Sequence, residues 1–106
     1  MLLQEKYNFK REVLEDPGPV LVDFWAPWCG PCRALNPTIH NLARDHKVCQ
    51  VNIDNNPKLA SMYQVQAVPT LLVFRGGQPV KRIEGAVPEA HLRAELEAAK
   101  QLSRSA

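Results

Sequence analysis

Residues 20–32 read VLVDFWAPWCGPC, an apolar run that leads directly into two cysteines three positions apart. The nearly continuous apolar run over 20–25 is typical of a central β-strand that is covered on both faces. A Cys-x-x-Cys that follows a buried strand and opens a helix is a redox site more often than a metal clamp. The stretch therefore predicts a redox-active pair, Cys29 and Cys32, at a strand-to-helix turn.

The segments around this stretch indicate an α/β fold. Apolar residues at helical spacing predict a helix from residue 29 to about 46, with Pro37 inside it, and an amphipathic helix over about 88–102. Further strands are expected at 48–53, 70–74 and 80–84, with a hairpin turn at 75–78, and short helices capped by asparagine at 8–14 and 57–63. This order predicts a mixed central β-sheet flanked by helices on both faces, and 106 residues suit a single domain over residues 1–106.

The composition argues against several classes of protein. With 45% apolar and 23% charged residues the chain can build a core, and its formal charge of +2, with both signs interleaved, predicts no nucleic-acid or membrane partner. No apolar stretch approaches the length of a membrane span, and the first residues lack the pattern of a secretory signal. Three cysteines suit a reducing compartment in which one pair cycles and one thiol stays free. We therefore expect a cytoplasmic protein, and nothing points away from a monomer.

The spacing of the two cysteines predicts their roles. Residues three apart share a helix face, so the Cα atoms of Cys29 and Cys32 should lie roughly 5–6 Å apart, within reach of a disulfide. Cys29 stands at the helix start, where unpaired N–H groups favour a thiolate, and is the expected nucleophile. Cys32, a turn deeper, is expected to be more buried and to resolve the mixed disulfide. Gly30 lets a partner's backbone approach, Pro31 rigidifies the turn, and Trp28 gives an apolar approach.

The alternative for the cysteine pair is a zinc site. Tetrahedral zinc would need two more ligands, and the chain offers no second Cys-x-x-Cys but only Cys49, His40, His46 and His91 at unsuitable spacings. We therefore expect no metal. The three histidines are expected at the surface, and Cys49, inside an apolar strand, is expected to be a buried structural thiol rather than a regulatory one.

Asp23 interrupts the apolar strand just before the cysteines. An unpaired buried carboxylate is costly, so a buried Asp23 would have a raised pKa and could exchange a proton with Cys32 through a water molecule. Alternatively, Asp23 is a strand-end carboxylate that is solvated or hydrogen-bonded to the backbone. The sequence leaves both interpretations open, although the nearby redox pair favours the first.

The stretch 22–32 closely resembles the thioredoxin family. The resemblance extends across nearly the whole chain through Pro37, residues 52–54, Asn56-Pro57, Val68-Pro69-Thr70, Phe74, Gly77 and Gly85-Ala86. It implies a thioredoxin fold and protein-disulfide reductase activity, with a thioredoxin reductase supplying electrons and disulfide-containing proteins as targets. No cofactor is expected.

The resemblance also implies a surface on which targets dock. Pro69 resembles the family's cis-proline, whose bond after Val68 would lie across from the disulfide and offer backbone to the substrate. Trp28, Val68, Pro69, Gly85 and Ala86 match the family's apolar docking surface. Pro69 would also help to keep metal away from the cysteines.

Three departures from the family pattern carry predictions. Gln50 stands where many members have a buried lysine, so Asp23 should be harder to ionise and have a high pKa. The segment 42–48 is several residues shorter than usual, so the helix should run almost directly into the next strand. Only Leu2 and Leu3 are apolar before the first helix, so the first edge strand should be short, displaced or absent and could expose a sheet edge.

Two other functions fit parts of the pattern. One is a disulfide-forming oxidase or isomerase domain. The Gly30-Pro31 dipeptide argues against it, because this dipeptide resembles the reductant class. The other is a binding module that keeps the fold without the chemistry. A purely structural role requires neither sulfur, so the intact Trp-Cys-Gly-Pro-Cys argues against it.

Overall fold

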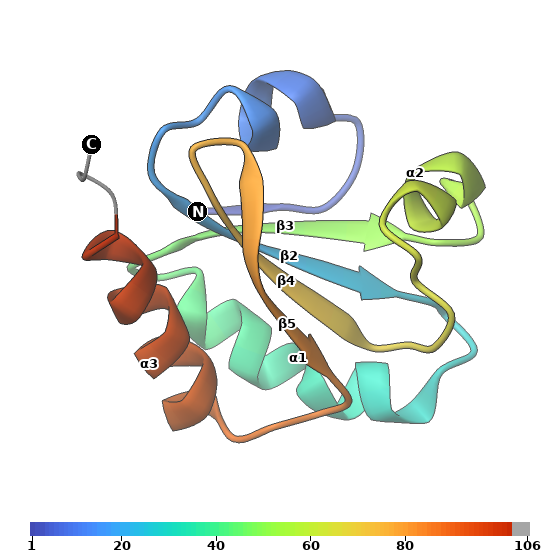
Figure 1. Ribbon diagram of the computed structural model, residues 1–106. Coiled ribbons are helices and arrows are strands. Elements are labelled where there is room, and N and C mark those ends of the chain that lie inside the picture. Colours follow the sequence, from blue (N-terminus) through green and yellow to red (C-terminus); the bar gives the residue numbers. More distant parts are fainter. Residues whose placement is uncertain (103–106) are drawn as a thin grey trace.

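The computed structural model describes residues 1–102. Within this range, five strands form one mixed sheet in the order β1-β3-β2-β4-β5 (Figure 1). The strands are β1 (Leu2–Leu3), β2 (Pro19–Trp25), β3 (Lys47–Asn52), β4 (Thr70–Arg75) and β5 (Gln78–Glu84). The helices are the short η1 (Lys10–Leu14), α1 (Gly30–Leu42), α2 (Pro57–Met62) and α3 (Glu89–Lys100). The predicted α/β architecture is confirmed.

The strand β2 lies in the middle of the sheet and is buried on both faces. It pairs parallel to β3 and antiparallel to β4. Figure 1 shows α1 and α3 against one face, with η1 and α2 against the other. Leu21 points into the core beside α1 and α3, whereas Val22 packs in the core on the opposite side, and both are fully buried. Burial on both sides explains why the strand is apolar at successive positions.

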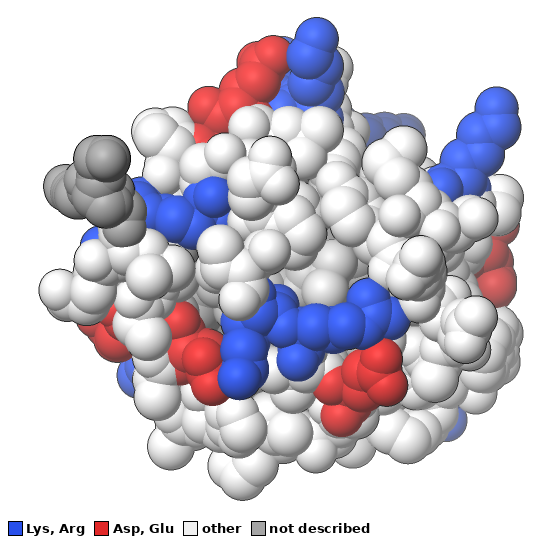
Figure 2. All heavy atoms as spheres, in the orientation of Figure 1, with Lys and Arg blue, Asp and Glu red and all other residues white. Residues whose placement is uncertain are grey.

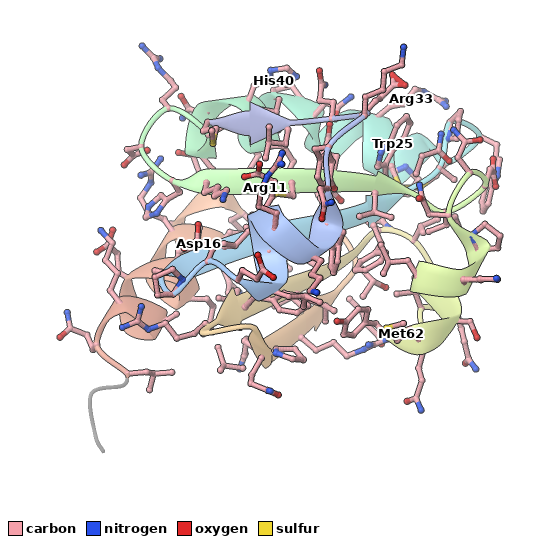
Figure 3. All side chains as sticks on the ribbon, turned by 90° about the horizontal axis from the view of Figure 1, so that it is seen from above. Arg11, Asp16, Trp25, Arg33, His40 and Met62 are labelled. Atoms are coloured by element: carbon pink, nitrogen blue, oxygen red, sulfur yellow. A yellow bond between two sulfur atoms is a disulfide. The ribbon has the colours of Figure 1, made fainter. Side chains whose placement is uncertain are left out.

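The chain direction places the cysteines at one edge of the sheet. β2 ends at Trp25, α1 begins at Gly30, and the parallel strand β3 ends at the same edge (Figure 1). In α/β sheets this edge, beyond the carboxyl ends of parallel strands, is where binding sites usually lie. Figure 3 shows Trp25 and Arg33 toward this end of the molecule.

The first strand is short, as predicted. Leu2 and Leu3 pair in parallel with Val48 and Cys49, so β1 forms the edge of the sheet beside β3 (Figure 3). Two residues are enough to set the register, and the next residue, Gln4, is thereby directed toward Gln50.

The end of α1 differs from the sequence prediction. The helix stops at Leu42 rather than near His46. Because β3 already begins at Lys47, the short connection expected from the sequence is nevertheless confirmed. The backbone N–H of His46 donates to the carbonyl of Leu42 at 2.9 Å in the closing turn. This turn carries His46 inward, where its side chain is 4% exposed and its Nε2 lies 3.4 Å from Glu97 Oε2 of α3. The prediction that His46 is exposed is wrong, because tertiary packing against α3 overrides its polarity.

The cap of α2 also differs in detail. Asn56 occupies the cap position before Pro57, but its side chain makes no capping hydrogen bond. Instead, its Nδ2 donates to the carbonyl of Asn52 at 2.9 Å and so bridges the β3–α2 connection. At the first short helix the cap position is Phe9, which makes no side-chain capping hydrogen bond, rather than the expected Asn8. Asn8, one residue earlier, still contributes there, because its Oδ1 accepts from the backbone N–H of Arg11.

The β4–β5 hairpin turns at Gly76 and Gly77, as the sequence predicts. Both residues have positive φ, +61° and +78°, which favours glycine. Gly77 has a second constraint, because a Cβ atom there would overlap the carbonyl oxygen of Leu14 at the end of η1. The hairpin and η1 can therefore pack closely only with glycine at this position.

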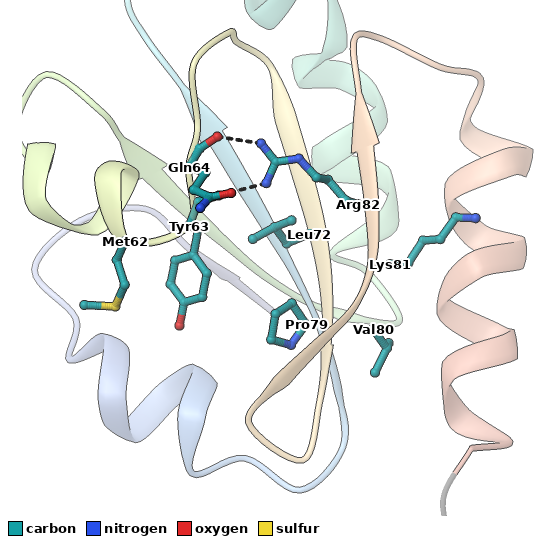
Figure 4. A pocket seen from close by; sticks show the side chains of 8 residues that line it. All are labelled: Met62, Tyr63, Gln64, Leu72, Pro79, Val80, Lys81 and Arg82. Atoms are coloured by element: carbon teal, nitrogen blue, oxygen red, sulfur yellow. Dashed lines mark hydrogen bonds between the residues drawn. The ribbon is translucent and has the colours of Figure 1, made fainter.

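The edge strand β5 is tied to α2 by Arg82. Its guanidinium donates to the carbonyls of Tyr63 and Gln64, each at 2.8 Å (Figure 4). Beside this contact is a hollow of about 430 Å³ lined by Met62, Tyr63, Gln64, Leu72, Pro79, Val80, Lys81 and Arg82, a set that includes neither cysteine of the pair. On the face drawn in Figure 2, acidic side chains lie next to basic ones. The basic residues of β5 are paired in this way, in Lys81–Glu95 and Arg82–Glu84.

Candidate active site

Cys29 and Cys32 form a disulfide at the start of α1. Cys29 is the cap residue of the helix and Cys32 lies in its first turn, with Pro31 between them. Their Cα atoms are 5.3 Å apart, which confirms the separation predicted from helix geometry.

The helix start directs a donor at the sulfur of Cys29. The backbone N–H of Cys32 donates to Cys29 Sγ at 3.1 Å. A donor in this position stabilises negative charge on the sulfur when the pair is reduced, and the helix dipole acts in the same sense. The two cysteines therefore differ in their electrostatic surroundings.

The expected difference in burial is not observed. Both cysteines are 4% exposed, because Ala26 and Val68 pack against them. The prediction that Cys32 is the more buried is wrong for this disulfide form. The position of each sulfur relative to the helix start, rather than burial, distinguishes the two.

Asp23 is buried in β2, the strand that leads into the cysteine turn. Only 2% of it is exposed, and Oδ2 accepts a hydrogen bond from Gln50 Nε2 at 2.9 Å. Burial raises the pKa of the Asp23 carboxyl to about 6, against the opposing effect of the Gln50 bond. Among residues 1–102, Oδ1 has no hydrogen-bond partner. The burial expected for Asp23 is confirmed and the solvated strand-end alternative is wrong, whereas proton exchange with Cys32 stays a prediction.

Two residues that contact Gln50, the hydrogen-bond partner of Asp23, were not predicted from the sequence. Gln4 donates to Gln50 Oε1 at 3.2 Å, and Gln50 Nε2 also lies 3.4 Å from Asn36 Oδ1. Asn36 follows Cys32 by four residues, so its position on the same helix face was a usable signal. Gln4 gave no such signal, because its contact depends on the register of β1.

The segment around Pro69 lies against the disulfide. The Val68–Pro69 peptide bond is cis, and the carbonyl oxygen of Val68 is 3.6 Å from Cys29 Sγ. The Pro69 carbonyl accepts from the N–H of Gly85 at 2.9 Å, which brings the 85–86 segment to the same place. Pro69 itself is buried, whereas Ala86 is exposed.

Trp28 is the large exposed residue beside the pair. It is 65% exposed, and its Nε1 donates to Asp54 Oδ1 at 3.3 Å. The structure thus brings Val68, Pro69 and Gly85, from distant parts of the chain, to the cysteine turn that carries Trp28.

Cys49 is separate from the disulfide pair. It is fully buried in β3, and burial raises the pKa of its thiol to about 11, so the thiol is kept neutral. This confirms the expectation of a buried structural residue.

In the described part of the chain, no three His, Cys, Asp or Glu side chains are grouped so as to hold a metal ion. Nor does any helix within residues 1–102 have the length and apolar character needed to cross a membrane.

A Cys-x-x-Cys pair that can close and open a disulfide at a helix start carries two electrons per cycle. The fold and this pair together define a thiol–disulfide oxidoreductase.

Comparison with known proteins specifies the family. The family model described as Thioredoxin matches residues 1–98. Thioredoxin 1 of Nostoc sp. is 50% identical over 94 residues, which cover 85% of this chain and 88% of the relative. The chloroplastic M-type thioredoxin of Chlamydomonas reinhardtii is 47% identical over 87 residues, covering 78% of this chain and 62% of that protein. The chain belongs to the thioredoxin family.

The structural comparison agrees with the sequence comparison. A solved structure of a mutant thioredoxin from Halobacterium salinarum matches with a TM-score of 0.86 and 35% identity, covering 96% of this chain and 93% of that one. The fold is therefore the thioredoxin fold. The activity is reductive thiol–disulfide exchange, for which the family implies disulfide-containing targets and a reductase that restores the dithiol.

Proposed function

We propose that this chain is a general reductant of protein disulfides in which Cys29 attacks and Cys32 resolves. The observation that carries the proposal is the hydrogen bond from the N–H of Cys32 to Cys29 Sγ at 3.1 Å, at the positive end of α1. This arrangement favours a thiolate on Cys29 over one on Cys32.

The proposed reaction has two exchange steps. The Cys29 thiolate attacks one sulfur of a target disulfide, forms a mixed disulfide and releases the first target sulfur as a thiolate, which takes a proton. The Cys32 thiol then loses its proton and attacks Cys29 Sγ, which closes the Cys29–Cys32 disulfide and releases the second target thiolate. Two electrons pass from the dithiol to the target.

We infer that Asp23 accepts the proton of Cys32 in the second step. A carboxyl whose pKa is raised to about 6 can both take and return a proton near neutral pH. Its Oδ1, which has no partner among the described residues, is the oxygen free to do so through a water molecule.

Targets are proposed to dock on Trp28, Val68, Pro69, Gly85 and Ala86, with Gly30 and Pro31 allowing close approach to the sulfur. The exposure of Trp28 and Ala86 supports this surface, as does the contact between the Val68 carbonyl and Cys29 Sγ. Because the bond after Val68 is cis, the backbone of this segment would be presented beside Cys29 Sγ to an extended segment of the target.

We further propose that a thioredoxin reductase restores the dithiol, and that residues 1–106 act as a single-domain monomer in the cytoplasm. The low and mixed charge supports protein partners rather than nucleic acid or a membrane surface.

The first test is the reduction potential of the Cys29–Cys32 pair, measured by equilibration with defined glutathione ratios. A reductant should have a potential more negative than the glutathione poise of roughly −220 to −260 mV. A markedly more oxidising value would reassign the chain to disulfide formation.

The second test separates the roles of the cysteines. With insulin as the disulfide substrate, Cys32→Ser should accumulate a mixed disulfide through Cys29, and Cys29→Ser should accumulate none. Cys49→Ala, which also removes a thiol, should retain turnover. A mixed disulfide trapped on Cys32 in the Cys29→Ser variant would reverse the assignment.

A further inference from the structure

A chain of side-chain amides runs from the protein surface to Asp23. It starts at Gln4, which is exposed and follows β1, and passes to Gln50 in β3. From Gln50 it reaches Asp23 in β2 and Asn36 in α1. Four segments of the chain therefore meet at one buried carboxamide.

The Gln50 carboxamide has a fixed polarity in this chain. An ionised Asp23 can only accept, so it requires the Gln50 NH₂ group, which also faces Asn36 Oδ1. The oxygen of Gln50 must then face the opposite way and needs a donor. Gln4 supplies that donor through its Nε2 at 3.2 Å.

The same polarity distinguishes the two oxygens of Asp23. Oδ2 is occupied by the Gln50 donor, so a proton there would compete with that hydrogen bond. Oδ1 has no partner among the residues described and remains available. If the Gln50 amide turned over, its oxygen would face Oδ2 and would demand a proton on that oxygen instead.

We propose that Gln4 is a positioning residue for the proton of Asp23: by donating to Gln50 Oε1, it holds the Gln50 NH₂ against Asp23 Oδ2 and leaves Oδ1 to carry the transferable proton. The contact depends on β1, because the pairing of Leu3 with Cys49 brings the next residue, Gln4, beside Gln50. The functional part of this inference rests on the proposed role of Asp23 in proton transfer.

The test reverses the orientation of the Gln50 amide by a substitution at the exposed Gln4. In Gln4→Glu, the new carboxylate can only accept, so Gln50 should turn its NH₂ outward and its oxygen toward Asp23. An acceptor beside the carboxyl disfavours its ionised form, so the pKa of Asp23 should rise by about one unit or more. Gln4→Lys, which can only donate, should keep the polarity and leave the pKa of Asp23 unchanged or lower.

The matched control is Asn55→Asp, which adds the same charge at an exposed position lining the same surface hollow as Gln4. It reports the through-space effect of a negative charge without contact to Gln50. The pKa of Asp23 is read in the oxidised full chain by carbon-detected NMR titration of its carboxyl. A shift in Gln4→Glu no larger than in Asn55→Asp would overturn the proposal.

A second variant guards against misfolding of Gln4→Glu. Gln4→Met removes the donor without adding charge and should raise the pKa of Asp23 by a smaller amount, and no shift in this variant would also overturn the proposal. Because the titration needs no turnover, it is independent of the catalytic role of Asp23. The rate at which Cys32 resolves the mixed disulfide is measured separately in Asp23→Asn. If the pKa of Asp23 responds to Gln4 as expected but this rate is unchanged in Asp23→Asn, the proton-transfer proposal fails and the positioning contact stands.

Discussion

Asp23 and Gln50 face each other in register on the parallel strands β2 and β3, and the Gln50 amide donates to Asp23 Oδ2 at 2.9 Å. A neutral donor at this position only partly offsets the cost of burying the carboxyl, and the pKa of Asp23 is about 6. The oxidoreductase therefore holds a group that titrates near neutral pH in β2, the strand that leads into its cysteine turn.

The raised pKa of Asp23 predicts a pH-dependent cost to stability. The folded state holds the proton more tightly than the unfolded state, whose ordinary value is 3.8, so the free energy of unfolding should fall as pH rises from about 4 through 6. Above pH 7, ionisation of the buried Asp23 lowers the free energy of unfolding by about 3 kcal/mol. Asp23→Asn should therefore be more stable by about 1–3 kcal/mol at pH 8, with the difference shrinking toward pH 4.

Urea unfolding at pH 4, 6 and 8 measures this difference. Glu5→Gln, which removes an exposed carboxylate, is the control and should show no such pH-dependent gain. Equal gains in the two variants, or a gain for Asp23→Asn that is independent of pH, would contradict the assignment of the cost to the buried Asp23.

His46 predicts the opposite dependence. Burial lowers its pKa, although Asp45 and Glu97 favour its charged form and Lys100 and Arg93 oppose it. The unfolded state therefore binds a proton first as the pH falls below about 6.5, and stability is lost in acid. His46→Gln should lose less free energy of unfolding between pH 7 and pH 5 than the parent chain.

The exposed His40 of α1 provides the matched control for this experiment, as His40→Gln. Both variants are compared with the parent by urea unfolding, so that the contribution of Asp23 cancels. A His46→Gln protein that tracks the parent across this range would show that the buried imidazole is not the group responsible.

The turn glycines predict unequal costs for the same substitution. Gly76→Ala meets only the strain of a positive φ, about 1 kcal/mol, because nothing lies within contact of the new methyl group. Gly77→Ala meets the same strain and also the Leu14 carbonyl, which is backbone and cannot easily move. We expect Gly77→Ala to lower the free energy of unfolding by about 2 kcal/mol or more. Equal losses in denaturant would show that η1 does not pack on the turn.

Cys49 predicts a selective pattern of alkylation. Its thiol is fully buried and its pKa is raised to about 11, so iodoacetamide at pH 8 should modify the reduced Cys29 much faster than Cys49. Mass spectrometry of the native protein should find Cys49 unmodified, and in urea it should react. Modification of Cys49 at the same rate as Cys29 in the native protein would favour the regulatory role.

Much of the fold could be predicted from the sequence because its signals are local. The doubly apolar run of β2, the Gly76-Gly77 turn and the amphipathic face of α3 each occupy one segment, and the structure confirms all three. The end of α1 could not be predicted. Its polar closing residues suit a helix as well as a turn, and the decision depends on where His46 packs against α3.

The redox pair was determined by the sequence alone. Two cysteines three residues apart at a helix start have a fixed separation, and the adjacent backbone donors come from the same turn. Only the tertiary structure decided what surrounds them. Val68 lies against Cys29 from 39 residues away, Gln50 reaches Asp23 across 27, and Gln4 reaches Gln50 across 46. These contacts depend on strand register and burial, which combine distant segments. The local sequence therefore determines the redox pair, and the fold determines the surroundings that modify its chemistry.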